Sequence, residues 1–364
     1  MVAGPVPNGK VPGRSTEFDG VGELKREIAG QPDAVAATLA DAALERYLDR
    51  LAGAVHESGE LLVTGMGASL HCGLVLAEVL RERGIRAWAL PASDLLHYGE
   101  LLEVEPVLIL SQSGASAEVE RLLARGGGSG RGELGEGVEG LTLDPASPLG
   151  AAGAGVIPGG VERAFAATRS FTTTVAALYG LATRLGVAID LGALPGSLRP
   201  ALEAPRVEGA AAHLAGASTI FVTGRGPLHG LAEYVALMLM ELTRVPCAAL
   251  ESAQLRHGPL EAAGEQLAVI ALAAHGGSGG LVRKLAQELV GDGSPVVLLD
   301  AGLEPGEGGG SRTAPFTIGL PMANEVAAVL PLAVCAQRLA VALAEARGIR
   351  PGVPLRSSKV TREE

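Results

Sequence analysis

An apolar run that ends in a cluster of small polar residues constrains this chain more than any other segment. Residues 106–110 are Pro-Val-Leu-Ile-Leu, and Ser-Gln-Ser-Gly-Ala-Ser follows at 111–116 before a helical pattern begins near Val119. This order predicts a buried strand, a tight turn and a helix N-terminus. Free backbone N–H groups and the helix dipole favour an anion at such a turn, so the segment indicates a phosphate-bearing ligand. An ordinary turn capped by Ser111 or Ser113 is the alternative.

The strand-then-glycine pattern occurs in both halves of the chain. Val-Thr-Gly closes an apolar run at 63–65 and again at 222–224, about 160 residues later. Alternating strands and helices in two similar halves predict an α/β chain with two tandem doubly wound α/β/α domains and parallel sheets. Further strands are expected at 87–90, 141–143, 155–158, 267–272, 295–299 and 315–318, and helical patterns at 23–57, 163–185, 230–242 and 325–347.

Glycine and proline punctuation sets the expected boundaries of the domains. The glycine-dense segment 126–140 is expected to be an exposed, mobile loop. We expect a disordered N-terminus at 1–20, a first domain at 21–195, a linker at 196–205, a second domain at 206–347 and a C-terminal tail at 348–364.

Charge and composition exclude several functions. The net charge of −11 leaves no broad basic surface for nucleic acid, and aromatic residues, at 3 %, are too few for base-stacking platforms. The start of the chain has no signal-peptide pattern, and its apolar runs are broken before 18 residues, so we expect no membrane span. Three widely spaced cysteines fit buried thiols in a reducing compartment. We therefore expect a cytoplasmic protein whose partners include neither nucleic acid nor a membrane.

Five motifs, in the same order, resemble a known family. They are Gly65-Met66-Gly67-Ala68-Ser69, Ser111-Gln112-Ser113-Gly114, Glu162 with Thr168-Arg169-Ser170-Phe171-Thr172, Glu241 with Leu255-Arg256-His257-Gly258-Pro259-Leu260, and Ser358-Lys359-Val360-Thr361. On these motifs, residues 22–364 resemble the tandem sugar-isomerase (SIS) domain family, and in particular the isomerase half of glutamine–fructose-6-phosphate aminotransferase (glucosamine-6-phosphate synthase). The glutaminase half of that enzyme begins with a nucleophilic cysteine, whereas this chain begins Met1-Val2-Ala3 and has its first cysteine at Cys72. Glutamine-dependent synthesis is therefore not expected.

The resemblance implies three catalytic residues. Glu241 would carry the proton between C1 and C2 of an open-chain sugar, and its apolar surroundings should raise the pKa of its carboxyl group, as a base needs near neutral pH. His257 would open the sugar ring from the neighbouring subunit, which implies a homodimer with shared active sites. Lys359, on a tail folded over the site, would contact the sugar near its anomeric end. Considered alone, they could equally be a salt-bridged glutamate, a loop histidine and a solvated lysine.

The resemblance also implies which residues hold the phosphate and the sugar hydroxyls. Neutral hydroxyl and amide groups suffice there, because a helix N-terminus lies behind them. The chain departs from the synthase at Ala68, Ala115, Ala167 and Met238, where the synthase has threonine, glutamate, serine and lysine, and these changes bear on substrate identity more than on reaction class. The expected substrate-binding residues are Gly67, Ala68, Ser69, Ser111, Gln112, Ser113, Ser116 and Ala167.

Together these motifs predict a phosphosugar isomerase or deaminase. The expected reaction is aldose–ketose proton transfer on a hexose or amino-hexose 6-phosphate, such as fructose 6-phosphate or glucosamine 6-phosphate. We expect no metal, since the histidines show no metal-ligand spacing and the reaction that the resemblance implies needs none. We expect no other cofactor, and the full Gly-x-Gly-x-x-Gly pattern of a dinucleotide site is absent. A phosphosugar sensor that binds without turnover and a fructosamine-6-phosphate deglycase are the alternatives. Residues 1–60 carry no basic recognition helix of the kind that a DNA-binding sensor needs.

Overall fold

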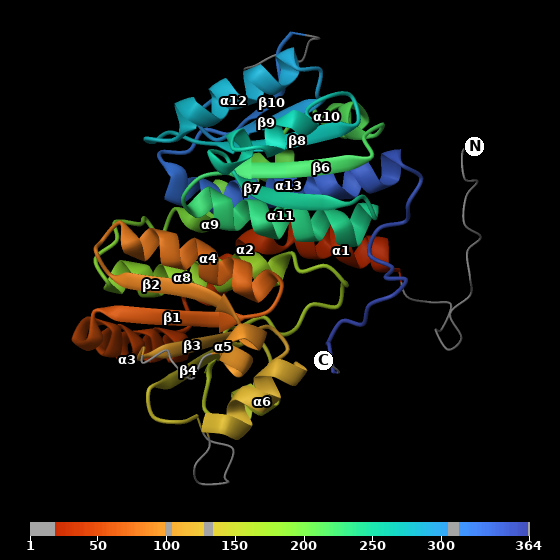
Figure 1. Ribbon diagram of the computed structural model, residues 1–364. Helices are drawn as coiled ribbons and strands as arrows, with labels where there is room; N and C mark the ends of the chain where they lie inside the picture. Colours follow the sequence, from red (N-terminus) through yellow and green to blue (C-terminus); the bar gives the residue numbers. More distant parts are fainter. Residues whose placement is uncertain (1–18, 99–103, 127–133, 305–312, 363–364) are drawn as a thin grey trace.

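Two parallel sheets organise the computed structural model, which describes residues 19–98, 104–126, 134–304 and 313–362. Each sheet has five strands, and every described strand pair is parallel. Helices from both domains pack in the layer between the two sheets (Figure 1). The predicted fold class, two tandem α/β domains with parallel sheets, is confirmed.

The first domain begins with three helices: α1 (Gly20–Ala29), α2 (Gln31–Leu39) and α3 (Ala42–Ser58). Its strands have the order β2-β1-β3-β4-β5 across the sheet. They are β1 (Glu60–Gly65), β2 (Arg86–Pro91), β3 (Val107–Ser111), β4 (Val138–Thr142) and β5 (Gly155–Val156). The remaining helices are α4 (Ala68–Arg81), α5 (Ala92–Tyr98), α6 (Ala117–Gly126), α7 (Pro148–Ala151) and α8 (Arg169–Arg184).

The second domain follows α9 (Leu194–Glu203) and has the strand order β7-β6-β8-β9-β10. Its strands are β6 (Thr219–Gly224), β7 (Cys247–Glu251), β8 (Leu267–Ala273), β9 (Val296–Asp300) and β10 (Phe316–Gly319). Its helices are α10 (Val207–Leu214), α11 (Pro227–Thr243), α12 (Gly279–Gly291) and α13 (Glu325–Ala346), with the short 3-10 helices η2 (Gln254–Arg256) and η3 (Pro259–Ala262).

The two domains repeat one topology. When the strands are numbered within each domain, both sheets have the order 2-1-3-4-5. The residue before each equivalent helix also repeats: Gly67 before α4 has φ 52° and ψ −130°, and Gly226 before α11 has φ 52° and ψ −131°. In this topology the chain turns in opposite directions after the first and third strands, and a crevice opens at their carboxyl ends. The N-termini of α4 and α6 flank that crevice in the first domain.

The helices α4 and α11 cross closely where the domains meet. An added Cβ at Gly230 would lie 2.7 Å from the backbone nitrogen of Val75, so only glycine permits this approach. Most of the buried apolar residues of both domains form one continuous cluster that reaches from α1 to α13, and two smaller clusters lie under α12 and α6. The two domains therefore pack as one body around a shared core.

Some elements differ from the sequence expectations. The helical pattern over 23–57 is divided into three helices, with Asp41 capping α3 through bonds from the N–H groups of Ala43 and Leu44. The helix expected from 163 begins only at Arg169. The sequence also does not predict β7, whose small residues give a weak strand pattern, or α12, which begins inside a run of glycines. Most of the predicted disordered terminus and parts of the glycine-rich loops, residues 1–18, 127–133 and 305–312, lie outside the described residues.

The segment predicted as a linker, 196–205, is largely helical, since α9 covers most of it. Pro195 lies in the first turn of α9, where a missing N–H group needs no partner. Leu194, Leu198 and Ala201 are buried against the rest of the protein. Pro195 therefore marks the start of a packed helix and not an extended connection, and Pro200 lies inside that helix.

Among the described residues, α13 is the one helix long and apolar enough to cross a membrane by length and composition. In the folded chain, 78 % of its most apolar 18-residue window is buried inside the protein. Its apolar character therefore belongs to the core.

A buried polar network joins helices of both domains and ends next to the crevice. Gln31 Nε2 donates to Gln337 Oε1 at 2.6 Å, and Gln337 Nε2 donates to the Tyr234 hydroxyl at 2.9 Å. That hydroxyl in turn donates to the carbonyl of Ala167 at 2.6 Å. Because unpaired polar groups are costly in a buried site, the network ties the loop before α8 to α2, α11 and α13.

Replacing Gln337 by leucine should lower the free energy of unfolding by about 2–3 kcal/mol, because the Gln31 amide and the Tyr234 hydroxyl lose buried partners. Urea unfolding followed by circular dichroism measures this change. Gln287→Leu on the exposed face of α12 is the matched control and should stay within about 0.5 kcal/mol of the parent. Equal stabilities of the two variants would contradict a structural role for the network.

Candidate active site

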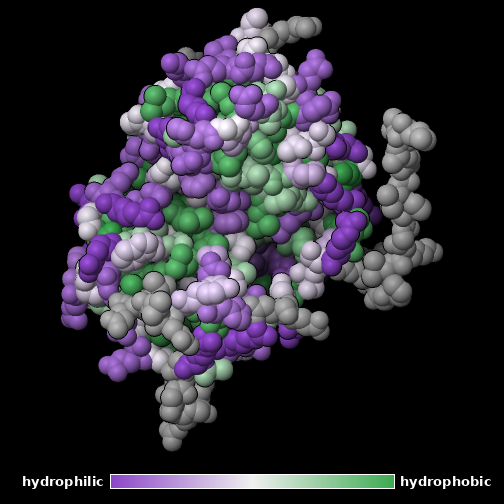
Figure 2. All heavy atoms as spheres, in the orientation of Figure 1, coloured by the Kyte–Doolittle hydropathy of each residue, from purple (hydrophilic) through white to green (hydrophobic). Residues whose placement is uncertain are grey.

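A cavity of about 300 Å³ opens at the carboxyl edge of the first sheet. Its walls come from the turns after β1 and β3, from α11 and the loop before α8, and from the C-terminal tail. Figure 2 shows the surface hollowed beside that tail. The lining residues are Met66, Gly67, Ala68, Ser69, Leu110, Ser111, Gln112, Ser113, Ser116, Val119, Val161, Phe165, Ala167, Leu237, Glu241, Ser357, Ser358, Lys359, Val360 and Thr361.

The cavity brings together almost all of the residues that the sequence singles out. Every predicted substrate-binding residue lines it, and so do Glu241 and Lys359. His257 is the exception: it lies at the end of η2 in the second domain, exposed to solvent, and is not among the lining residues. A single chain therefore assembles two of the three predicted catalytic residues with the serine-rich turn.

The turn after β3 is held open by its own side chains. Ser111 Oγ accepts a hydrogen bond from the N–H of Gly114 at 3.1 Å, and Ser116 Oγ accepts one from the N–H of Val119 at 3.4 Å at the start of α6. Gly114 has φ +59°, and an added Cβ there would lie 2.0 Å from Ser147 Oγ. Glycine is thus required at this position, both for its backbone angle and for space.

Unpaired donors at this turn point to an anionic ligand. The Gln112 side-chain nitrogen is buried and has no hydrogen-bond partner among the residues that the structure describes. The N-terminus of α4 next to it, at Gly67, has no side-chain cap. Buried donors without partners are rare, and a helix N-terminus attracts negative charge. A phosphate in the cavity would therefore satisfy groups that the protein itself leaves unpaired.

The C-terminal tail closes one side of the cavity. It leaves α13 in the second domain and runs down to the first domain (Figure 1), where the carbonyl of Thr361 accepts a hydrogen bond from the N–H of Ala117 at 3.1 Å. Lys359 is exposed as a residue, but its ammonium turns inward and donates to the carbonyl of Ala164. The tail therefore places a cation beside the loop that precedes α8.

Glu241 lies in the last turn of α11 and lines the cavity. Burial raises the pKa of its carboxyl group to about 7; nearby Lys359 acts to lower this pKa, and Glu162 acts to raise it. The expectation of a raised pKa thus agrees with the geometry. A carboxyl group with such a pKa can both accept and return a proton near neutral pH.

Glu162 lies behind the cavity wall, with only 3 % of its surface exposed. Its carboxylate accepts hydrogen bonds from the Thr168 N–H at 2.9 and 3.1 Å, from the Thr168 hydroxyl at 2.7 Å, and from the Ser170 hydroxyl. These bonds hold residues 163–168 out of the helix that the sequence pattern predicts. Glu162 does not line the cavity. It influences the site through its charge and by fixing the shape of the loop that forms the cavity wall.

Comparison with known proteins identifies the family. The SIS domain model matches residues 213–303. A Streptomyces coelicolor protein named as a candidate D-galactosamine-6-phosphate deaminase, AgaS, is 32 % identical over 390 residues, covering 96 % of this chain and 96 % of its own length. The chain belongs to the SIS-domain family.

Two further SIS proteins show which part of the larger enzymes is similar. The glutamine–fructose-6-phosphate aminotransferase of Pyrobaculum aerophilum is 27 % identical over 356 residues, which cover 94 % of this chain and 57 % of that enzyme. The chain thus spans little more than half of that aminotransferase. The C-terminal domain of glucosamine-fructose-6-phosphate aminotransferase from Francisella tularensis has the same fold, with a TM-score of 0.78, 20 % identity, and coverage of 91 % of this chain and 98 % of that one.

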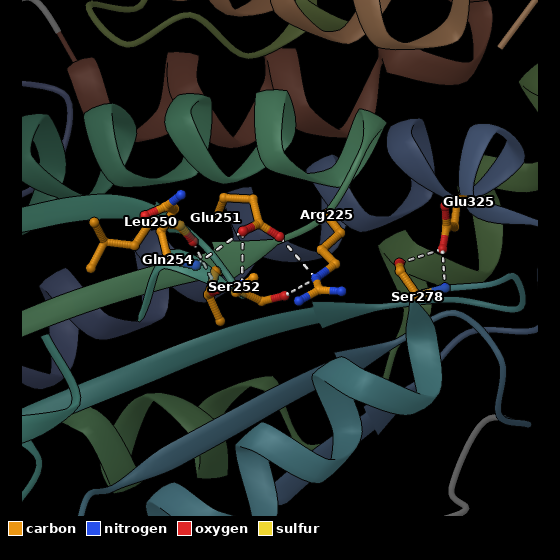
Figure 3. Close-up of polar contacts among 9 residues, drawn as sticks. Arg225, Leu250, Glu251, Ser252, Gln254, Ser278 and Glu325 are labelled. Atoms are coloured by element: carbon orange, nitrogen blue, oxygen red, sulfur yellow. Dashed lines mark hydrogen bonds and ion pairs between the residues drawn. The ribbon is translucent and has the colours of Figure 1, made fainter. Parts of the chain in front are cut away.

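The equivalent edge of the second SIS domain is filled by the protein's own charges (Figure 3). Glu325 Oε1 accepts hydrogen bonds from the Ser278 hydroxyl at 2.6 Å and the Ser278 N–H at 3.3 Å, at the start of α12. Arg225 pairs with Glu251 at 2.8 Å and donates to Ser252 Oγ at 2.7 Å. A carboxylate of the chain thus lies where the first domain leaves donors unpaired. The turn at 111–116 together with the N-terminus of α4, called the anion cradle below, is therefore the one open anion site that the repeated topology provides among the described residues.

Two features of the site are not evident from sequence. Met238, where the synthase has lysine, is 1 % exposed, and its Sδ lies 3.5 Å from the Tyr234 hydroxyl oxygen, so this departure concerns the core and not the cavity wall. Val161, Phe165 and Leu237 form an apolar side of the cavity. Leu237 lies one helical turn before Glu241, a spacing that could have identified it, whereas the loop residues give no such signal.

Replacing Ser113 by alanine should weaken the binding of inorganic phosphate about fivefold, because one neutral hydroxyl at the cradle is worth about 1 kcal/mol. Isothermal titration calorimetry measures the dissociation constant and the number of sites. Ser278→Ala, at the equivalent edge of the second domain, should leave the affinity unchanged, with one site per chain in both proteins. A larger loss of phosphate affinity in Ser278→Ala than in Ser113→Ala would show that phosphate binds in the second domain, contrary to this prediction.

Proposed function

We propose that this chain catalyses aldose–ketose proton transfer on an amino-hexose 6-phosphate and releases ammonia from it, as a sugar-phosphate isomerase of the deaminase type. The observation that carries the proposal is a half-buried carboxyl group with a pKa of about 7, Glu241, in the same cavity as a serine-rich anion cradle. The name of the Streptomyces coelicolor relative supports the amino-sugar substrate.

The cradle would hold the phosphate and so fix where C1 and C2 of the sugar lie relative to Glu241. Neutral donors from Ser69, Ser111, Gln112, Ser113 and Ser116 would surround it, with the N-terminus of α4 behind them. Gly67, Ala68 and Ala167 would contribute backbone groups and space. Lys359 would face the carbonyl or anomeric oxygen of the sugar from the tail.

Glu241 would then remove the proton from C2 of the open-chain sugar and return it to C1. For an amino sugar, this converts the C1 aldehyde and C2 amine into a C2 imine with a C1 hydroxyl. Water adds to the imine carbon, and ammonia leaves as the ketose 6-phosphate forms, so that one water is consumed for each ammonia released. The same proton transfer without an amine is simple isomerisation.

The charge balance near Glu241 supports a cationic substrate. Glu241 and Glu162 lie near one another, and Lys359 interacts electrostatically with both. A protonated amine at C2 would interact favourably with this pair of carboxyl groups. A hexose phosphate without an amine would lack that interaction.

A second subunit would complete the site. His257 is exposed on the second domain, outside the cavity of its own chain, which supports its delivery to the cavity of a partner copy. There it would protonate the ring oxygen during ring opening. Sedimentation that finds only monomers in active preparations would contradict this shared arrangement.

Replacing Glu241 by glutamine should lower turnover about 10²- to 10⁴-fold, because the amide cannot accept the C2 proton, while phosphosugar binding persists. The measurement is incubation with hexose and hexosamine 6-phosphates in deuterated water, with readouts for ammonia, ketose and deuterium at C1 and C2. Binding of the same sugars is followed by calorimetry.

The matched control is Glu233→Gln, two turns earlier on α11, whose side chain lies 3.8 Å from His229 and does not line the cavity. This variant should keep near-normal turnover. Binding without label, ammonia or ketose in the parent protein, for every sugar phosphate, would support the sensor instead. Turnover of a fructosamine 6-phosphate, and of no other sugar phosphate tested, would support the deglycase.

The rate of C2 proton exchange should rise as pH increases toward about 7 and level off above it. Since burial raises the pKa of Glu241 from 4.5 to about 7, the carboxyl group is protonated below that pH and cannot act as a base. Deuterium exchange into the substrate, followed by NMR from pH 5 to 9, measures this rise in the exchange rate. A midpoint of this rise near pH 4.5 would assign the proton transfer to a solvated carboxylate.

A further inference from the structure

A carboxylate from the first described helix reaches the loop beneath the tail lysine. Glu27, on α1, accepts hydrogen bonds from two successive backbone N–H groups, that of Arg163 at 2.7 Å and that of Ala164 at 3.2 Å. These residues lie 136 and 137 positions away in the chain. The two oxygens of one carboxylate thus fix a short stretch of loop that belongs to no helix or strand.

The same stretch of loop receives the tail. The carbonyl of Ala164 accepts a hydrogen bond from Lys359 Nζ. Ala164 is therefore bonded on its N–H side to Glu27 and on its carbonyl side to Lys359. It is fully buried, so neither bond has water as a ready substitute.

We propose that Glu27 is a positioning residue of the site: by fixing the backbone at 163–164, it sets where the Lys359 ammonium lies in the cavity. The consequence for turnover rests on the proposed function, whereas the placement of the ammonium does not. Glu27 does not line the cavity and does not touch the place where a sugar would bind.

Three carboxylates around this contact favour the protonated form of Lys359. Burial lowers the pKa of Lys359, and Arg169 lowers it further, whereas Glu162, Glu27 and Glu241 raise it. Burial and Glu162 raise the pKa of Glu27, and its two backbone hydrogen bonds and Lys359 lower it. An ionised Glu27 thus helps to keep Lys359 protonated while it holds the loop.

The same helix offers a matched control. Glu23 lies one turn before Glu27 and pairs with Arg26 at 2.9 Å and with the side chain of Arg163 at 3.6 Å. It accepts no described hydrogen bond from the backbone at 163–164. Glu23→Gln therefore removes a carboxylate from α1 and from the neighbourhood of Arg163 without loosening the contact that holds Lys359.

The chain's composition makes Lys359 directly observable. Only four lysines are present, at positions 10, 25, 284 and 359, beside 25 arginines. Protein labelled with ¹³C at lysine Cε should therefore give four NMR signals, and Lys359→Arg assigns the signal of interest. Titration of that signal reports the protonation of Lys359 without any need for turnover.

In Glu27→Gln, the Lys359 signal should titrate at lower pH than in the parent, because one carboxylate that raises its pKa is gone. Turnover should fall roughly ten- to a hundredfold, with the dissociation constant of inorganic phosphate within about twofold of the parent, because the cradle is untouched. Glu23→Gln should match the parent in all three measurements. Glu27→Asp, which keeps the charge but shortens the reach, should lose turnover with a smaller change in the Lys359 titration.

An unchanged Lys359 titration in Glu27→Gln would overturn the proposal. So would a parallel loss of phosphate affinity and thermal stability in both Glu27 variants, which would make the role of Glu27 structural only. If the parent protein turns over no sugar phosphate, the proposed function fails, but the Lys359 titration still decides whether Glu27 positions the ammonium. The two failures are thus distinguishable.

Discussion

The close crossing of α4 and α11 is the contact on which the candidate site depends. The anion cradle belongs to the first domain, whereas Glu241 arrives on α11, a helix that begins at the carboxyl edge of the second sheet. The two groups face one cavity because α11 packs closely against α4, an approach that Gly230 permits. A continuous apolar core then keeps this crossing fixed. This rigidity holds the anion cradle and Glu241 at a fixed separation, which a reaction on a phosphate-anchored sugar requires.

Desolvation and charge balance together define the reacting end of the cavity. Burial acts on Glu241 and Lys359 in opposite senses, raising the pKa of the acid and lowering that of the base, and their mutual attraction opposes both effects. Glu162 adds a negative charge that hydroxyl and backbone donors stabilise. Since these groups come from α11, the tail and the loop before α8, a shift of any one of them changes the protonation of the others.

The sequence predicts the parts of this protein that local pattern determines. Apolar runs locate most strands, and the repeated Val-Thr-Gly at the ends of β1 and β6 reveals the duplicated topology. Proline at 195 suggests a linker because the burial of Leu198 is invisible in the sequence. Motif resemblance indicates the residues that line the cavity, yet Glu27 is missed, because a glutamate on an amphipathic helix ordinarily faces solvent. Only the return of residues 163–164 to α1 gives that carboxylate a partner, and such a contact between distant segments has no local signature.

The tail has a consequence for the order in which the molecule matures. Residues 357–361 line the cavity, and they are the last of its walls to leave the ribosome. The core and both sheets precede them in the chain, so a folded body can form before its cavity is closed. A nascent chain would then carry the cradle and the glutamate but not the lysine. The site would acquire the ammonium of Lys359 only after the core has been synthesised, when the tail reaches across from one domain to the other.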